Sequence, residues 1–262
     1  MKTWTQQRYK SDNDRAIYAE IKTPAPLIVR VDGRKFKHVL RDNDFKKPYD
    51  EQFARSMAEA TVAFFDKSGF NPVLAYIFSD EINLLFASVP FKGRLEKLDS
   101  VIASFIASSL TVILDFKDAI AFDARVIPVC GENDTLEYLA QRQAEAWRNH
   151  INAYGFYGLI EDGLTKTAAG KRLRGMKAKD VHEMLFRMGI NLNETPKWQR
   201  RGFLVAKQGY EKSGYNPKAA ESVTILRYKT VQHWDLPLFT SEEGRDFVCA
   251  IVKEWARRDL NP

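Results

Sequence analysis

Residues 76–86, "YIFSDEINLLF", decide the fold, because three polar residues separate two apolar runs. Short runs rich in β-branched and aromatic residues are typical of strands, and so short a connection joins them as a hairpin. The turn carries two adjacent acids, Asp80 and Glu81. Because burying an unpaired carboxylate is costly, we expect these acids either to form a solvated tip or to hold a ligand.

The residues around this hairpin form a larger pattern. An apolar run at 27–31 ends at Asp32-Gly33, as in a strand that leads into a turn. Apolar residues recur on one helix face over 50–67 and over 95–116, and 121–129 has strand character. The order β-α-β-β-α-β is the ferredoxin-like arrangement. We therefore predict an α/β (α+β) fold with a first domain at 1–133 and its core at about 26–130.

The second half, 134–262, is predicted to be helical and strand-containing and to pack on the first domain as one globular body. Residues 134–160 have the apolar spacing of a long helix. A basic stretch and a short helix are expected within 163–190, strands at 200–207 and 222–231, and a closing helix at 240–255.

Composition excludes several classes of protein. The 262 residues are 45% hydrophobic and 28% charged, which is ordinary for a soluble globular chain. The net charge of +6 permits a polyanionic partner such as nucleic acid. Two distant cysteines without zinc spacing favour a reducing compartment, so a cytoplasmic location is expected. Neither a signal peptide nor an apolar run of about 20 residues is present, which argues against a membrane protein.

The strand order brings distant acids together. In this topology the first and third strands are antiparallel central neighbours, so Asp32 and Asp80 are expected to converge at one sheet edge. Paired carboxylates there suit Mg²⁺, and two such ions serve in phosphoryl transfer. Gly33 allows close backbone approach, while Arg34, Lys35 and Lys37, followed by Lys46 and Lys47, place cations beside a triphosphate. The alternative is an ordinary turn at Asp32-Gly33 and a solvated hairpin tip.

Three elements carry a resemblance to a known family. "VRVDGRKF", "FKKPYD" and "SDEINLLF", in this order and spacing, resemble the tRNA(His) guanylyltransferase superfamily. "FDARVIPV" at 122–129, "RQAEAWRNHIN" at 142–152 and "KWQRRGFLV" at 197–205 extend the resemblance. It is clear over about 27–160 and weaker to about 206.

The resemblance implies a palm domain of the polymerase and cyclase type that works in reverse. Family members add GTP or another NTP to the 5′ end of tRNA, in the 3′–5′ direction, after activation of that end with ATP. The resemblance further implies metal ligation by Asp32, Asp80 and the Gly33 carbonyl, with two Mg²⁺ ions. It also implies a homotetramer built as a dimer of dimers. The catalytic residues are expected to be Asp32, Asp80 and Glu81, and the nucleotide-binding residues Asp32, Gly33, Arg34, Lys35, Phe36, Lys37, Lys47, Ser79 and Asp80.

Two departures favour one branch of the family. Eukaryotic members have His where this chain has Lys37, with His38 one place later, and the helix before "HIN" is longer here. This pattern is similar to the guanylyltransferase-like branch, which performs templated repair of tRNA 5′ ends. Strict addition of G−1 to tRNA(His) is the alternative.

The second half contains further candidates for binding nucleotide or tRNA. By resemblance His150 and Asn152 contact the nucleotide or the tRNA 5′ end, and an exposed polar helix face is the alternative. Basic residues that could follow tRNA phosphates are Lys171, Arg172, Arg174, Lys177, Arg200 and Arg201, with Lys166 and Lys179 beside them. The alternative for these is a solvated basic face.

Two other functions compete with nucleotide addition to tRNA. A nucleotidyl cyclase-like palm enzyme would use the same two aspartates without tRNA, but the basic second half argues against it. A non-catalytic RNA-binding module is the third reading, and the intact Asp32 and Asp80 pair argues against that.

Overall fold

The structure is a computed structural model that describes residues 18–216 and 221–259. Residues 1–17 of the predicted first domain lie outside the described residues. The elements, in chain order, are β1 (Leu27–Gly33), α2 (Phe36–Asp42), α3 (Glu51–Lys67), β2 (Leu74–Phe78), β3 (Glu81–Phe86), η1 (Pro90–Gly93), α4 (Leu95–Ile113), β4 (Phe122–Pro128), α5 (Glu132–Glu161), α6 (Lys166–Leu173), α7 (Ala178–Arg187), η2 (Leu192–Glu194), α8 (Lys197–Arg201), β5 (Phe203–Asn216), β6 (Glu221–His233) and α9 (Glu242–Asp259).

The described strands form one antiparallel sheet in the order β4-β1-β3-β2-β5-β6. The first four strands have the order of the ferredoxin-like arrangement, so the predicted fold is confirmed. β1 and β3 are antiparallel neighbours, and Asp32 lies directly opposite Glu81 in their register. Asp80 is one residue beyond the paired segment, in the turn.

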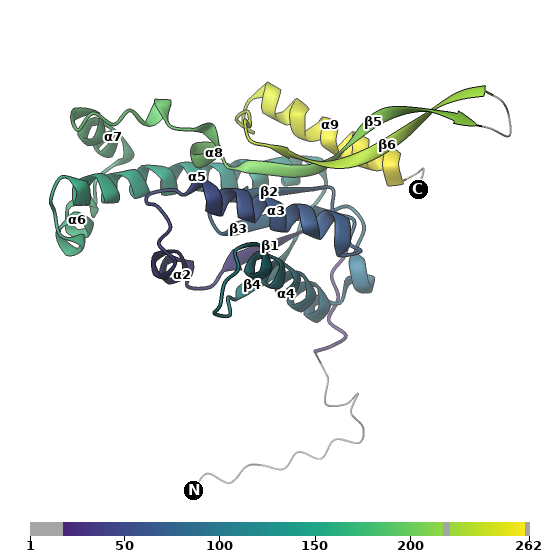
Figure 1. The fold of residues 1–262 in the computed structure, drawn as a ribbon, viewed down its shortest axis with the longest axis horizontal. Helices are drawn as coiled ribbons and strands as arrows, with labels where there is room; N and C mark the ends of the chain where they lie inside the picture. Colours follow the sequence, from purple (N-terminus) through teal and green to yellow (C-terminus); the bar gives the residue numbers. More distant parts are fainter. Residues whose placement is uncertain (1–17, 217–220, 260–262) are drawn as a thin grey trace, which may run out of the picture.

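Helices cover both faces of the sheet (Figure 1). Alternate strand residues such as Val29, Val31 and Leu84 face α3 and α4, where they form the larger core. Their neighbours, including Ile28 and Leu85, face α5 and α9 on the other side. This two-sided burial explains why the central strands are apolar on both faces. The polar turn after β2 therefore lies at one end of a fully covered sheet.

The second half joins the sheet of the first, which the sequence did not predict. β5 pairs with β2, with Ala75 opposite Val205, and β6 extends the sheet further. Without β5 the buried strand β2 would have unpaired backbone groups along one edge, which is unfavourable. Both strands run beyond the expected ranges of 200–207 and 222–231, and their hairpin projects from the body (Figure 1).

The helices between the two parts also differ from expectation. The basic region contains two helices, α6 and α7, separated near Gly175, which has a φ of +80°. Helix α2 was not predicted, because it is short and buries one residue, Phe36. In the described ranges no helix combines the length and the apolar character needed to cross a membrane.

Candidate active site

The β2–β3 turn is held in a fixed shape next to the end of β1. Ser79 has a positive φ of 52°, and its Oγ donates a hydrogen bond to Asp80 Oδ1 at 2.9 Å. The backbone N–H of Gly33 donates to the Asp80 carbonyl at 3.2 Å. The chain segments that carry Asp32 and Asp80 are thus joined directly, as the topology predicted.

Gly33 permits this close approach. A Cβ atom at this position would lie 2.7 Å from Asp80 Oδ2 and would overlap the Phe36 ring. Phe36 is buried against Phe53 and Phe122 and has little freedom to move away. A larger residue at position 33 would therefore displace either the Asp80 carboxylate or the start of α2.

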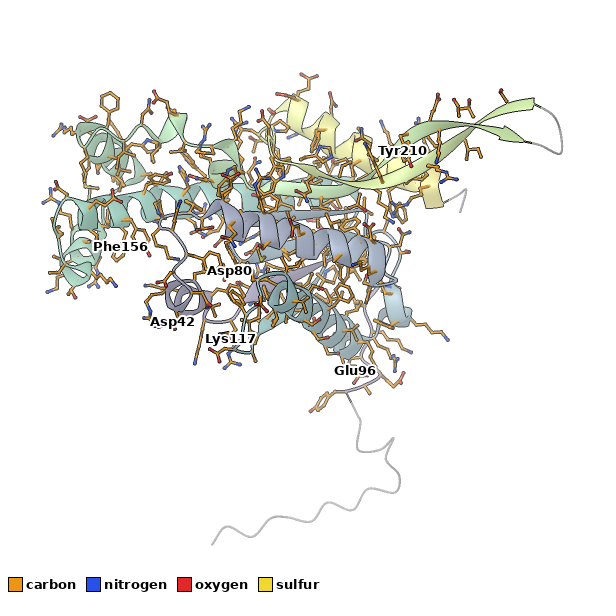
Figure 2. All side chains as sticks on the ribbon, in the orientation of Figure 1. Asp42, Asp80, Glu96, Lys117, Phe156 and Tyr210 are labelled. Carbon is orange, nitrogen blue, oxygen red and sulfur yellow. The ribbon has the colours of Figure 1, made fainter. Side chains whose placement is uncertain are left out.

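A cleft of about 520 Å³ opens beside this turn, between α2, α3 and α5. Figure 2 labels Asp80 near the centre of the molecule. Four lysines line the cleft, and none of them forms an ion pair with a carboxylate of the described residues. The polar lining includes Lys35, Lys37, Lys46, Lys47, Tyr49, Asp50, Ser79, Asp80, Asn149, Asn152 and Gln199. This concentration of cations and amides suits a phosphorylated ligand.

Burial and neighbouring charges alter the acid–base properties of the site. Burial, together with the charge of Asp32, raises the pKa of Asp80 to about 6. The pKa of Asp32 is also raised, by burial and then by Glu81 and Asp123. Burial lowers the pKa of Lys47. The two aspartates are thus carboxylates that would gain from a cation between them.

Glu81 has a different environment from its neighbour Asp80. It is buried, and Arg142 on α5 contacts it through two bonds, with Nε to Oε1 at 2.8 Å and Nη2 to Oε2 at 2.5 Å. Asn83 donates to Glu81 Oε1 at 2.8 Å, and the Tyr138 hydroxyl donates to Asn83 at 2.7 Å. The expectation that both acids could form a solvated tip is therefore wrong for Glu81.

The other predicted residues of the first half fall into two groups. Gly33, Lys35, Phe36, Lys37, Lys47, Ser79 and Asp80 all line the cleft. Asp32 does not line the cleft; it lies at the end of β1, where it is opposite both Glu81 and Asp123. Arg34 is exposed and lines a separate surface depression with His38.

The two candidates on the long helix α5 differ in their exposure to solvent. Asn152 is exposed and lines the cleft. His150 is fully buried, so the predicted alternative of an exposed polar face is wrong for this residue. Its Nε2 lies 3.1 Å from the Thr195 hydroxyl, and its ring packs between Trp147 and Tyr49. Burial lowers the pKa of His150 to about 4, with a smaller contribution from Arg200.

The basic candidates of the second half lie outside the cleft. Those on α6, in the segment before α7 and at the start of α7 are exposed, at the end of α5 away from the sheet (Figure 1), and they are Lys166, Lys171, Arg172, Arg174, Lys177 and Lys179. Arg200 and Arg201, on α8, are half-buried, and Arg201 Nη1 donates to the Leu236 carbonyl at 2.8 Å.

Several site residues were missed from the sequence. Asn149 and Gln199 line the cleft from α5 and α8, and Arg142 binds Glu81 from 61 residues away. They lie within 142–152 and 197–205, two stretches that carry the family resemblance, but their contacts depend on how α5 and α8 pack. Asp123 could have been found, since pairing the first strand with the last in the predicted topology places it opposite Asp32.

The donor set can be tested against the implied magnesium. Across residues 18–216 and 221–259, no group of three or more His, Cys, Asp and Glu side chains is arranged to hold a metal ion. Two aspartates and a glycine carbonyl nevertheless fit Mg²⁺, because this ion retains waters and phosphate oxygens as its other ligands. The space kept free by Gly33 beside Asp80 supports that fit.

Comparisons with known proteins agree with this geometry. The family model described as tRNAHis guanylyltransferase matches residues 10–130, and the model described as the Thg1 C-terminal domain matches 133–235. A probable tRNA(His) guanylyltransferase of Drosophila melanogaster is 33% identical over 192 residues, which are 70% of this chain and 67% of that protein. The chain spans 65% of the corresponding mouse protein.

Solved structures show the same fold. The crystal structure of the tRNA(His) guanylyltransferase from Saccharomyces cerevisiae has a TM-score of 0.65 at 27% identity, over 73% of this chain and 91% of that one. A bacterial tRNA(His) guanylyltransferase-like protein in complex with ATP has a TM-score of 0.71 at 24% identity, over 92% and 96%. The predicted palm-like fold and the predicted nucleotidyltransferase family are confirmed, and the chain belongs to the tRNA(His) guanylyltransferase family.

Proposed function

We propose that this protein is a metal-dependent nucleotidyltransferase that adds nucleotides to the 5′ end of tRNA, in the 3′–5′ direction. The observation that carries the proposal is the cleft, in which Asp80, Gly33 and four lysines without carboxylate partners face one space. Family membership supplies the reaction class and the tRNA substrate. The first half contributes the reacting site, and the basic second half contributes to tRNA binding.

The reaction joins the 5′ phosphate of the tRNA to the 3′ hydroxyl of a nucleotide. The tRNA 5′ monophosphate is first activated by transfer of an adenylyl group from ATP, which releases pyrophosphate. The 3′-hydroxyl oxygen of an incoming GTP or other NTP then forms a bond to that 5′ phosphorus, AMP leaves, and the hydroxyl proton is lost. Where the 5′ end already bears a triphosphate, pyrophosphate is the leaving group instead.

The cleft residues have distinct roles in this reaction. Lys35, Lys37, Lys46 and Lys47 bind the triphosphate and neutralise its charge. Asp32, Asp80 and the Gly33 carbonyl would hold Mg²⁺, which when bound polarises phosphate oxygens and stabilises the charge that develops on them. The Ser79 hydroxyl orients one Asp80 oxygen, so the other remains available.

Glu81 acts on this site indirectly. Its two oxygens are engaged by Arg142 and Asn83, so it fixes the turn against α5. Helix α5 in turn supplies Asn149 and Asn152 to the cleft. We therefore assign Glu81 and Arg142 as positioning residues that set the distance between the turn and the far wall of the cleft.

Templated repair and strict G−1 addition differ in their substrates. Lys37 and the longer helix before "HIN" favour repair, whereas the curated relatives are named for tRNA(His). A panel of tRNAs that lack their first nucleotide separates the two. Repair predicts that each tRNA gains the nucleotide complementary to its 3′ partner base, and strict addition predicts that G joins tRNA(His) alone.

The same panel tests the whole proposal. If ATP, GTP, the other NTPs and Mg²⁺ extend none of the tRNAs, nucleotide addition to tRNA is wrong. Cyclic nucleotide formed from NTP alone would favour the cyclase alternative. The expected tetramer is tested separately, by the mass of the protein in solution.

A further inference from the structure

A second, smaller cleft lies against α5 and α8. It has a volume of about 360 Å³ and a mixed lining. Its apolar side includes Trp147 and Leu238, and Leu238 is 47% exposed. Its polar side includes Asn193, Arg200 and Arg201. An aromatic ring and apolar side chains beside a few cations form the kind of pocket that takes one nucleotide.

This cleft and the larger one lie on opposite sides of α5. Ala146, Asn149 and Ala153 line the larger cleft, whereas Ala140 and Ala144 line the smaller one. At about 100° of rotation per residue, these two sets point in roughly opposite directions from the helix axis. The two clefts are therefore separate sites that share a wall.

The shared wall is a row of packed rings. Tyr49, which lines the larger cleft, packs on His150 with ring centroids 5.6 Å apart. His150 stacks on Trp147, which lines the smaller cleft, at 5.5 Å and an angle of 16°. Helix α8 spans the same boundary, since Gln199 lines one cleft and Arg200 the other.

Arg200 has a buried hydrogen-bond donor that a ligand in this cleft could satisfy. Its Nε atom is buried, and no described residue accepts a hydrogen bond from it. Burial and the adjacent Arg201 lower the pKa of Arg200, and Asp235 offsets this in part. Because a buried donor without a partner is costly, an anion bound here would remove that cost.

We infer that this second cleft binds one unpaired nucleotide of the RNA substrate, with its base on Trp147 and its phosphate on Arg200. The inference rests on the proposed function and extends it. A free triphosphate is matched better by the four lysines of the larger cleft. A single nucleotide needs one stacking surface and one or two cations, and further exposed basic residues for the rest of the RNA are present on α6 and in the segment before α7.

Binding measurements with two variants test this assignment. Affinity for a tRNA transcript, for a short unpaired oligoribonucleotide and for GTP is measured as salt is varied. Arg200→Gln is expected to weaken both RNAs and to lower the slope of log K against log salt by about 0.7, the value for one phosphate. Trp147→Leu is expected to weaken both RNAs roughly 5- to 150-fold, without a change in slope.

A matched control removes one positive charge elsewhere. Arg94 lies at the start of α4, on the opposite face of the sheet from α5. The variant Arg94→Gln should therefore leave RNA binding unchanged. GTP affinity should stay constant in all three variants, which also shows that each is folded. If Trp147→Leu fails this check, Arg200→Gln decides alone.

The outcomes separate this inference from the proposed function. RNA binding by Arg200→Gln with unchanged affinity and slope would overturn the inference and leave the proposed function standing. Weakened GTP binding with intact RNA binding would also overturn it, since the cleft would then take free nucleotide. A wild-type chain that binds GTP and neither RNA would overturn the tRNA substrate as well.

Discussion

Charged side chains on the two sides of the β2–β3 turn differ in whether they have partners within the protein. On the cleft side, Asp80 and four lysines face a shared space without forming ion pairs among the described residues. On the side of Arg142, Glu81 is hydrogen-bonded to Arg142 and Asn83, and Tyr138 completes the network. Adjacent acids, Asp80 and Glu81, therefore have different functions.

This difference teaches how to separate ligand-binding charges from structural ones. A buried charge with a bidentate partner holds elements together, and removing one member leaves the other uncompensated. Charges that line an open cleft without a carboxylate partner are instead hydrated in the free protein, and a charged ligand can pair with them. The following predictions test the distinction between the cleft side and the Arg142 side, from the largest expected effect to the smallest.

The largest effect is expected from Asp80→Asn. It removes a negative oxygen from the cleft, so nucleotide addition should fall about 1,000-fold, as when one strong electrostatic contact to the transition state is lost. The melting temperature should not fall, because the variant also removes a carboxylate whose pKa burial raises to about 6. Single-turnover rates and thermal melts measure the two quantities.

Asp42→Asn is the control for this prediction. Asp42 is an exposed aspartate on α2 and pairs with Arg41 at 2.7 Å, outside the cleft. Its variant should keep full activity. A clear loss of stability in Asp80→Asn would show that the carboxylate is structural, contrary to the comparison.

Arg142→Met should produce the next largest effect, on stability. It leaves Glu81 buried without its partner, at a cost of about 3 kcal/mol in the free energy of unfolding. The double variant Glu81→Gln with Arg142→Met should recover most of this loss, and urea denaturation measures both. Arg148→Met, an exposed arginine on the same helix, should have little effect. An equally small effect of Arg142→Met would remove the structural role of the pair.

His150 should make stability depend on pH. In the folded protein burial lowers its pKa to about 4, so the unfolded chain binds a proton first as pH falls below about 6.5. Above pH 6.5 His150 is neutral in both states, and the free energy of unfolding is at its full value. Between pH 6.5 and pH 4 that free energy falls by about 3 kcal/mol. His150→Gln should lose correspondingly less on acidification in urea melts. Parallel losses in the two proteins would contradict the burial of this ring.

The smallest effect is expected from Lys47→Ala. One of four lysines is removed from the cleft, so KM for the NTP should rise about 10-fold, in line with one charge-assisted contact. Lys67→Ala, at the end of α3 outside the cleft, should leave KM unchanged. Identical KM values for both variants would mean that Lys47 does not contact the triphosphate.

The sequence predicted the sheet side of the site better than the helix side. Residues 27–31 and the hairpin at 76–86 have local strand patterns, and their order fixes which ends meet, so Asp32, Gly33 and Asp80 could be placed together. Arg142 could not be paired with Glu81, because that contact depends on the rotation and position of α5.

Burial was also harder to predict than secondary structure. The range of α5 was anticipated closely, yet His150 was not expected to be buried. Its spacing three residues after Trp147 and four before Tyr154 places it on their helix face, and this signal was available. The pairing of β5 with β2 had no such signal, because a strand pattern does not identify its neighbour.

The most direct test of the cleft's function is the position of the nucleotide that it adds. Labelled GTP is incubated with ATP, Mg²⁺ and a tRNA that lacks its first nucleotide, with the wild-type protein and with Asp80→Asn. We expect label at the 5′ end of the tRNA with the wild type and about 1,000-fold less with the variant. Label at the 3′ end, no label at all, or equal labelling by both proteins would contradict the account.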